Sequence, residues 1–240
     1  KFNWDNYLPG YSAMKEKERV VFFLRDGLSA AEKERMAAYG ADMSKYLDSG
    51  NEARIKKAYE SRDPRLQMAV ITPYAQYNGA SSGIAHTYTL RWPYRGSDSA
   101  EPFDIRTDTN DKFYYLWRKF VPEGLEQTER DTYGLDIPLI RYAEVLLLKA
   151  EALNEWGSTH ESEAIRCVNE VRRRAGHVEL NNATYPATKV NGQSDLRERI
   201  RNEYYWEIGG EDSMYFHELR WGTWKDKKFD NNRNGLMQMW

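Results

Sequence analysis

The segment 136–155, with the sequence DIPLIRYAEVLLLKAEALNE, determines the fold expected for this chain. Its apolar residues recur at the three- and four-residue spacing of an amphipathic helix. The stripe that they form consists of Tyr142, Ala143, Leu146, Ala150 and Leu153. Asp136 is placed for the N-cap region, Pro138 suits a first helical turn, and Gly157 suits a helix end. The segment therefore predicts a long helix that begins near Pro138 and ends at Gly157.

A second helix is expected soon after the first, from about residue 161 to residue 175, with Gly176 as its stop signal. Its apolar face consists of Ala164, Val168 and Val171. Large and small residues alternate in both helices as in a tetratricopeptide repeat, with a two-residue insertion in the turn. One such repeat cannot bury its own faces. We therefore expect packing neighbours from elsewhere in this chain or from a longer polypeptide.

The remaining expected elements are shorter. Helices are predicted over 30–39, 52–61, 195–208 and 214–219, the first with a capping box between Ser29 and Glu32. Strands are predicted over 66–71, 86–92 and 113–121, with loops around Gly79 and over 95–112. The fold class is mainly α, with tetratricopeptide-like helical hairpins, irregular loops and a few short strands. Residues 1–135 form the loop-rich segment and residues 136–240 the helical segment of one continuous domain.

Composition excludes several classes of function. The 240 residues carry a net charge of −2, so no basic field is available to recruit nucleic acid. Mean hydropathy is −0.85, and the longest apolar runs, 20–24 and 145–148, are far shorter than a membrane span. Aromatic residues reach 14%, with 17 Tyr, 8 Trp and 8 Phe. This surplus suits either a packed core or platforms on which sugars or peptides bind.

Residues that carry catalytic chemistry are poorly represented. The four histidines show no spacing typical of metal ligands, and the single cysteine, Cys167, lies near the packing face of a predicted helix. A buried structural thiol is the interpretation of Cys167, and no glycine-rich phosphate loop occurs. We therefore predict no enzyme activity and no cofactor. An α-helical glycosidase stays open as an alternative, because two carboxylates facing a cleft cannot be recognised from sequence.

Three motifs occur in a defined order. The first joins 62–66 to 71–74, the second joins 136–155 to 164–165, 169–172 and 174–176, and the third includes 198–203, 206–207, Gly210 and 219–222. Together they resemble the SusD/RagB family of outer-membrane nutrient-binding lipoproteins. The pair Gly209-Gly210 departs from the single glycine usual in the third motif. The resemblance therefore indicates a subgroup of that family.

The resemblance implies a cell-surface protein that binds oligosaccharides, or peptides in some members, without chemical conversion. It implies a TonB-dependent porin of the SusC type as partner and an outer-membrane tether through an N-terminal lipid. Family members are longer, so we expect this chain to be the C-terminal half of such a protein. The absence of an initiator Met, a signal segment and a lipobox cysteine from the sequence fits that expectation.

Ligand contacts are predicted in the least regular part of the chain, where aromatic rings stand beside polar side chains that can bind sugar hydroxyls. The candidate ligand-binding residues are Tyr74, Tyr77, Asn78, Trp92, Tyr94 and Arg95. The rings of Trp92 and Tyr94 are expected to stay exposed, whereas Tyr114, Tyr115 and Trp117 are expected to be half core. The charged residues Arg141, Glu144, Glu151, Arg172, Arg174 and Glu203 are interpreted as scaffold ion pairs.

Two alternatives remain open at this point. The aromatic residues between 74 and 95 can equally be structural. The chain can also be a tetratricopeptide-type scaffold that binds a protein in its groove and takes no small ligand.

Overall fold

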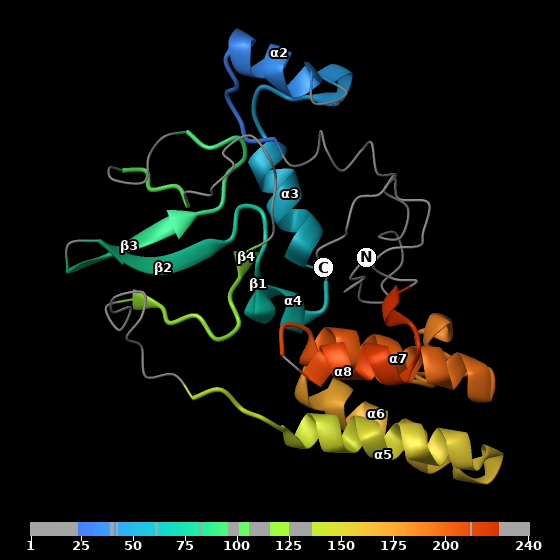
Figure 1. The fold of residues 1–240 in the computed structure, drawn as a ribbon. Coiled ribbons are helices and arrows are strands. Elements are labelled where there is room, and N and C mark those ends of the chain that lie inside the picture. The colour runs from blue at the N-terminus through green and yellow to red at the C-terminus, as the bar shows by residue number, and fades with distance from the viewer. Residues whose placement is uncertain are drawn as a thin grey trace. The chain divides into compact units, whose positions relative to one another are not determined.

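The computed structural model describes residues 24–38, 41, 43–60, 62–81, 83–95, 101–105, 116–124, 136–211 and 213–225 (Figure 1). The described residues belong to two compact units. The helical unit comprises the described residues from Ile137 onward together with Asp63–Arg65. The mixed unit comprises the described residues up to and including Arg62 and those from Leu66 to Asp136. The expected organisation as one continuous domain stays a prediction.

The helical unit contains α5 (Tyr142–Trp156), α6 (Glu161–Arg174), α7 (Gln193–Ile208) and α8 (Ser213–Arg220). Helices α5 and α6 lie side by side, and α7 packs on both (Figure 1). Short 3-10 turns, Ser158–His160 and Pro186–Thr188, lie in the connections. The core of the unit is apolar, and its fully buried members include Leu147, Ala150, Ala164, Val168 and Leu196. The predicted helix pair and the mainly-α fold class are confirmed.

The start of α5 differs from the expectation. The helix begins at Tyr142, because Arg141 has an extended backbone with φ −114° and ψ 152°. The Arg141 side chain binds Glu207 and Glu211, and this anchoring holds its backbone outside the helix. The expected start near Pro138 is therefore wrong, whereas the expected end at Gly157 is confirmed.

The mixed unit contains short helices and two small sheets. Its helices are α2 (Ala30–Ala38), a 3-10 turn (Met43–Lys45) and α3 (Asn51–Glu60), and α4 (Pro64–Ala69) leads into it. Its strands are β1 (Val70–Ile71), β2 (Gln76–Ser81), β3 (Ile84–Thr89) and β4 (Leu116–Trp117), with β1 antiparallel to β4 and β2 antiparallel to β3. The predicted capping box is confirmed, because the amide of Glu32 donates to Ser29 Oγ and the amide of Ser29 donates to Glu32 Oε2.

Three local predictions in this part of the chain are wrong. The strand expected over 66–71 forms only at Val70–Ile71, and residues 64–69 form a helix. Asp63 accepts a hydrogen bond from the Arg65 backbone amide at 2.9 Å, and Pro64 suits a first helical turn. The expected loop around Gly79 is strand β2. In the expected exposed loop 95–112, the described residues Phe103 and Asp104 are buried. Of the predicted strand 113–121, residues 113–115 lie outside the described residues, and the rest supplies the short strand β4.

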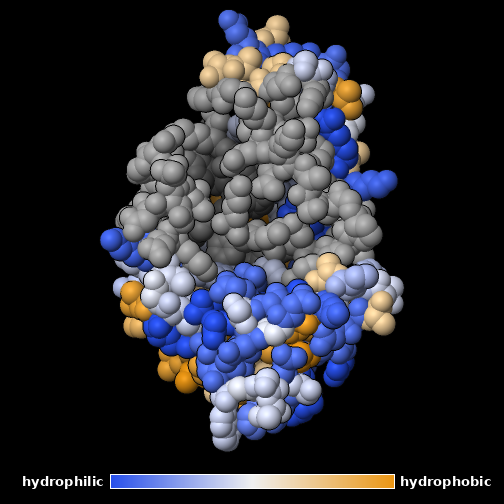
Figure 2. All heavy atoms as spheres, turned by 90° about the vertical axis from the view of Figure 1, so that its right-hand side faces the viewer, coloured by the Kyte–Doolittle hydropathy of each residue, from blue (hydrophilic) through white to orange (hydrophobic). Residues whose placement is uncertain are grey.

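The surface of the helical unit is mostly hydrophilic, with hydrophobic side chains between the polar ones (lower part of Figure 2). Large exposed hydrophobic side chains of this unit include Leu139, Ile140, Tyr142, Trp156 and Phe216. No helix in the described part of the chain combines the length and apolar character that crossing a membrane requires.

Candidate functional site

Two of the predicted ligand-binding residues are core residues of the mixed unit. The Trp92 side chain is 7% exposed and packs in a cluster with Leu24, Leu28 and Met36. Tyr74 is also buried, and its hydroxyl donates to the Trp92 carbonyl at 3.4 Å. The expectation that the Trp92 ring stays exposed is therefore wrong. Segments more than 50 residues away in sequence cover that ring, which the local sequence could not indicate.

Arg95 and Tyr94 lie beside this core. The Arg95 guanidinium donates to Asp104, from Nε to Oδ2 at 2.9 Å and from Nη2 to Oδ1 at 2.7 Å. Arg91 binds the same buried carboxylate at 2.6 Å. Asp104 is therefore neutralised from two sides, and its ion pair gives Arg95 a structural role. Tyr94 is half-buried, and the predicted ligand contacts of both residues stay predictions.

Tyr77 and Asn78 lie in β2, which is paired with β3. Directly opposite residues of an antiparallel pair share one face, and neighbours in a strand point to opposite faces. Tyr77 opposes Tyr88, and Gly79 opposes His86. Asn78 opposes Thr87 on the other face, where the Thr87 hydroxyl donates to Asn78 Oδ1 at 3.4 Å. The structure therefore places Asn78 and Tyr77 on opposite faces of the hairpin.

One face of this hairpin is aromatic. The ring centroids of His86 and Phe103 are 4.2 Å apart, and those of Tyr88 and Phe103 are 5.5 Å apart. The Tyr88 ring lies over Gly79 so closely that a Cβ at this position would be 2.8 Å from Tyr88 Cε2. A glycine is thus required where the ring crosses the strand. We call Tyr77, His86, Tyr88 and Phe103 the hairpin aromatic face; Phe103 is buried, and the other three are half-exposed.

Polar groups border the hairpin aromatic face. The Tyr77 hydroxyl donates to the Pro122 carbonyl at 2.8 Å, and burial raises the pKa of this phenol, so it stays a neutral donor. Arg118 and Glu123 form an ion pair at 2.5 Å, and Glu123 also accepts a hydrogen bond from the backbone amide of Asn78. The face thus combines stackable rings with fixed charged groups. Sequence reasoning missed His86, Tyr88 and Phe103, although Ser82-Gly83 between two short runs is a hairpin signal.

The other aromatic residues singled out in the sequence have mostly structural surroundings. Tyr114 and Tyr115 lie outside the described residues, and Trp117 is half-buried in β4. Trp221 packs on the core of the helical unit, and its Nε1 donates to Glu151 at 2.8 Å. Cys167 is buried, as predicted, and burial raises the pKa of its thiol. Within the described residues, no group of His, Cys, Asp or Glu is arranged to hold a metal ion.

Buried ion pairs hold the helical unit together. Glu203 of α7 is fully buried and accepts from Arg172 of α6 and from Arg65, each at 2.7 Å. Arg65 also binds Asp63 at 2.6 Å. Glu207, one helical turn after Glu203, accepts from Arg65, Arg141 and Arg174, and Arg141 also binds Glu211. We call this set the buried charge network: Asp63, Arg65, Arg141, Arg172, Arg174, Glu203, Glu207 and Glu211.

The buried charge network confirms that Arg141, Arg172, Arg174 and Glu203 are scaffold residues. The other two residues of that prediction also have structural partners. Glu151 binds Arg220 at 2.5 Å, and Glu144 Oε1 accepts a hydrogen bond from His217 Nε2 at 2.7 Å. These charged motif residues therefore hold helices together.

The network makes the unit sensitive to acid. Burial lowers the pKa of His177, and Arg172 lowers it further. Burial by itself would raise the pKa of Glu203, but Arg172 and Arg65 outweigh it and lower the pKa below the usual value. For both groups, the unfolded chain binds protons more readily than the folded chain. The neutral His177 ring and the ionised Glu203 carboxylate therefore favour the folded state at high pH. As the pH falls, this stabilisation is lost, first for His177 below about pH 6.5 and then, at lower pH, for Glu203.

We expect the free energy of unfolding to decrease between about pH 7.5 and pH 5.5, by at most about 1.4 kcal/mol per pH unit for the one proton on His177. The variant His177→Gln removes this titration, so its stability should change less over the same interval. Urea unfolding followed by circular dichroism at both pH values measures the difference. An equal loss in both proteins would contradict the role of His177.

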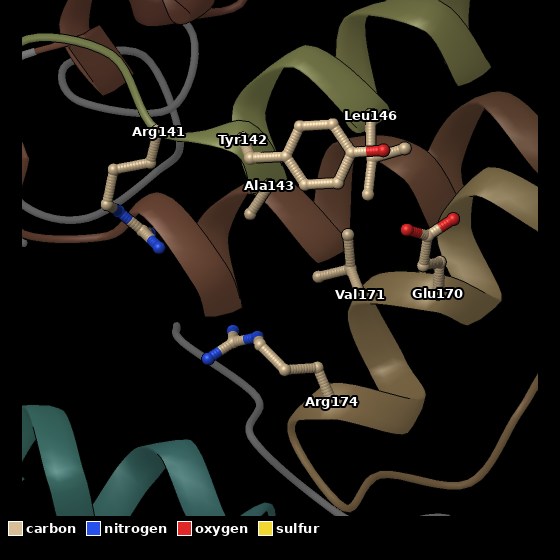
Figure 3. A pocket seen from close by; sticks show the side chains of 7 residues that line it. All are labelled: Arg141, Tyr142, Ala143, Leu146, Glu170, Val171 and Arg174. Atoms are coloured by element: carbon tan, nitrogen blue, oxygen red, sulfur yellow. The ribbon is translucent and has the colours of Figure 1, made fainter.

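A pocket of about 300 Å³ lies between the start of α5 and the end of α6 (Figure 3). Arg141 and Arg174 point toward one another on one side, and the Tyr142 ring and the Glu170 carboxylate lie on the other side (Figure 3). The Tyr142 side chain is 68% exposed. Its assignment to the buried stripe is therefore wrong, because the stripe of α5 is centred on Leu147 and Ala150 and leaves residue 142 outside.

The similarity to known proteins identifies the family. The model of the SusD family matches residues 21–239, nearly the whole chain. The chain belongs to the SusD family. This finding confirms the resemblance found in the three motifs.

Individual SusD-like proteins match parts of the chain. Over 104 residues it is 36% identical to SusD-like protein P38 of Formosa agariphila, a match that covers 43% of this chain and 20% of that protein. A crystal structure of a SusD-like protein from Bacteroides fragilis NCTC 9343 aligns with 89% of this chain and 37% of that chain, at 22% identity and a TM-score of 0.49. These matches cover only 20% and 37% of the lengths of the two SusD-like relatives.

Proposed function

We propose that this chain is part of a cell-surface protein that binds oligosaccharide nutrients, or peptides, for uptake through a TonB-dependent porin of the SusC type. The observation that carries the proposal is the match of the SusD family model over residues 21–239. The protein would be an outer-membrane lipoprotein, tethered through an N-terminal lipid. Binding would involve no chemical conversion.

The hairpin aromatic face is the proposed ligand contact of the mixed unit. The apolar C–H face of a pyranose ring can stack on Tyr77, His86 or Tyr88, while Arg118 and Glu123 offer partners for its hydroxyls. The same rings can hold the apolar side chains of a peptide. A shallow site of this kind gives dissociation constants from about 1 mM to 1 μM, or about −4 to −8 kcal/mol.

Tyr88 provides the test of this site. The variant Tyr88→Ala removes the central ring and is expected to weaken glycan binding at least about tenfold, which corresponds to 1.4 kcal/mol. Tyr88→Phe keeps the ring and should retain affinity. Thr87→Ala, on the opposite face of the same strand, is the matched control and should not change binding.

Isothermal titration of the 240-residue chain with a panel of neutral oligosaccharides and short peptides measures these affinities. Thermal melting of each variant shows whether the mixed unit stays folded. Absence of binding to every member of the panel would overturn the proposed function. Unchanged affinity in Tyr88→Ala would show that ligand binds elsewhere.

A second function is favoured by one observation. Ile137, Leu139 and Ile140 are exposed apolar residues directly before α5, as expected of a surface that docks a protein. A tetratricopeptide-type scaffold would use this surface and bind no sugar or peptide of the panel. Leu139→Asp would then lose a protein partner that the unmodified chain retains, whereas a nutrient-binding protein would keep its glycan affinity.

A further inference from the structure

The pocket between α5 and α6 has the size of a small binding site. Its volume of about 300 Å³ lies at the lower end of the range for small-molecule pockets. Ala143, Leu146 and Val171 give it an apolar lining. A space of this size suits one sugar ring or one amino-acid side chain, and it is too small for a longer segment of ligand.

Several groups around the pocket have unused binding capacity. Among the described residues, the Tyr142 hydroxyl and the Glu170 carboxylate make no hydrogen bond or ion pair. Arg174 contacts Glu207 through Nη2, and within the described part of the chain its Nε and Nη1 make no hydrogen bond. The pocket therefore offers an exposed aromatic ring, a carboxylate acceptor and guanidinium donors around an apolar lining (Figure 3).

The charge of the pocket selects among ligands. The positive charges of Arg141 and Arg174 are balanced by Glu207 and Glu211 at 2.5–2.9 Å. Glu170 adds a negative charge that forms no ion pair among the described residues, although Arg173 interacts with it electrostatically. An anionic ligand would meet this carboxylate without an unpaired arginine to compensate for it. A neutral, hydroxyl-rich group could donate to the Glu170 carboxylate, accept from the Arg174 guanidinium and pack on the Tyr142 ring.

We propose that this pocket is a second sugar subsite, which binds one neutral pyranose residue. The C–H face of the ring packs on Tyr142, its hydroxyls donate to Glu170, and Arg174 donates to a ring or hydroxyl oxygen. This inference rests on the proposed function of the chain as a glycan-binding protein. The subsite lies wholly within the helical unit and is built from residues different from the hairpin aromatic face.

Tyr142 and Glu170 provide the variants for the test. Tyr142→Ala removes the ring and is expected to weaken binding at this subsite at least about tenfold. Glu170→Gln keeps the shape but loses the charge, and it should weaken neutral-sugar binding about three- to tenfold. Tyr142→Phe keeps the stacking surface and should retain most of the affinity. Trp156→Ala, which removes an exposed ring at the other end of α5, is the matched control and should have no effect.

The probes are the methyl glycosides of glucose, galactose and mannose, with methyl glucuronoside as the acidic counterpart of the glucose probe. Titration of the 240-residue chain is followed by the chemical shifts of its tyrosine side chains, so that binding near Tyr142 is seen directly. We expect at least one neutral probe to bind with a millimolar dissociation constant, and the glucuronoside to bind about tenfold more weakly. Glu170→Gln should reduce that difference.

The outcomes separate this inference from the proposed function. Loss of binding in Tyr142→Ala and Glu170→Gln, but not in Trp156→Ala, supports the subsite. Loss in Tyr88→Ala alone would leave the proposed function standing and overturn the subsite. Equal binding of the acidic and neutral probes would overturn it as well. If no glycoside shifts the Tyr142 signals, the pocket accepts no sugar and the inference is wrong, whatever the larger glycans do at the hairpin.

Discussion

Replacing Glu203 by Gln is expected to lower the free energy of unfolding of the helical unit by about 3–5 kcal/mol. Glu203 is fully buried and lies between Arg65 and Arg172, whose Nη1 and Nε donate to its two oxygens at 2.7 Å. The amide of Gln keeps the volume but can neutralise neither guanidinium. Arg172 would then lose the carboxylate with which it pairs, whereas Arg65 would keep Asp63 and Glu207. Removing one partner of a buried ion pair is strongly destabilising.

The same helix provides the control for this prediction. Glu198 of α7 pairs with Arg201 at 3.1 Å, but its side chain is 60% exposed. Glu198→Gln should therefore change stability by less than about 1 kcal/mol, because solvent screens an exposed ion pair. Urea unfolding followed by far-ultraviolet circular dichroism compares the two variants. Equal losses would mean that the buried charge network adds no more than a surface pair does.

The sequence predicted the helical unit better than the mixed unit, for a physical reason. Helices α5 and α6 are long, close in sequence and bounded by Gly157 and Gly176, so local spacing carries most of the information. The helix expected over 52–61 does form as α3, which ends at Glu60, before the dipeptide Asp63-Pro64. The same dipeptide also starts α4, which the sequence did not indicate.

Burial depended on contacts that sequence spacing does not contain. Arg65 was part of a recognised motif, but its partner Glu203 lies 138 residues further along the chain. Trp92 was expected to be exposed because a polar loop follows it, yet residues of a distant segment cover it. The hairpin aromatic face depends on Phe103, which lies outside both strands. For this reason sequence spacing could not select the residues of the hairpin aromatic face one by one.

In the run Leu146-Leu147-Leu148, adjacent residues of one type differ widely in burial. Sequence spacing assigned Leu146 to the packing face, and Leu146 is buried there, but its neighbour Leu147 is the fully buried residue of the core. Leu148 is 41% exposed. Truncation of a buried leucine loses its transfer free energy and leaves a cavity that close packing cannot fill. Truncation of a half-exposed one leaves a space that water can enter.

We therefore expect Leu147→Ala to lower the free energy of unfolding by about 2–5 kcal/mol. Leu148→Ala, the adjacent control with the same change in composition and helix propensity, should cost about 1 kcal/mol or less. Urea unfolding at a pH above the titration of His177 separates this effect from the acid sensitivity of the buried charge network. Similar losses in both variants would mean that the Leu148 side of α5 is also packed, for example against a further segment of a longer polypeptide. The core would then extend beyond the buried stripe of α5 centred on Leu147 and Ala150.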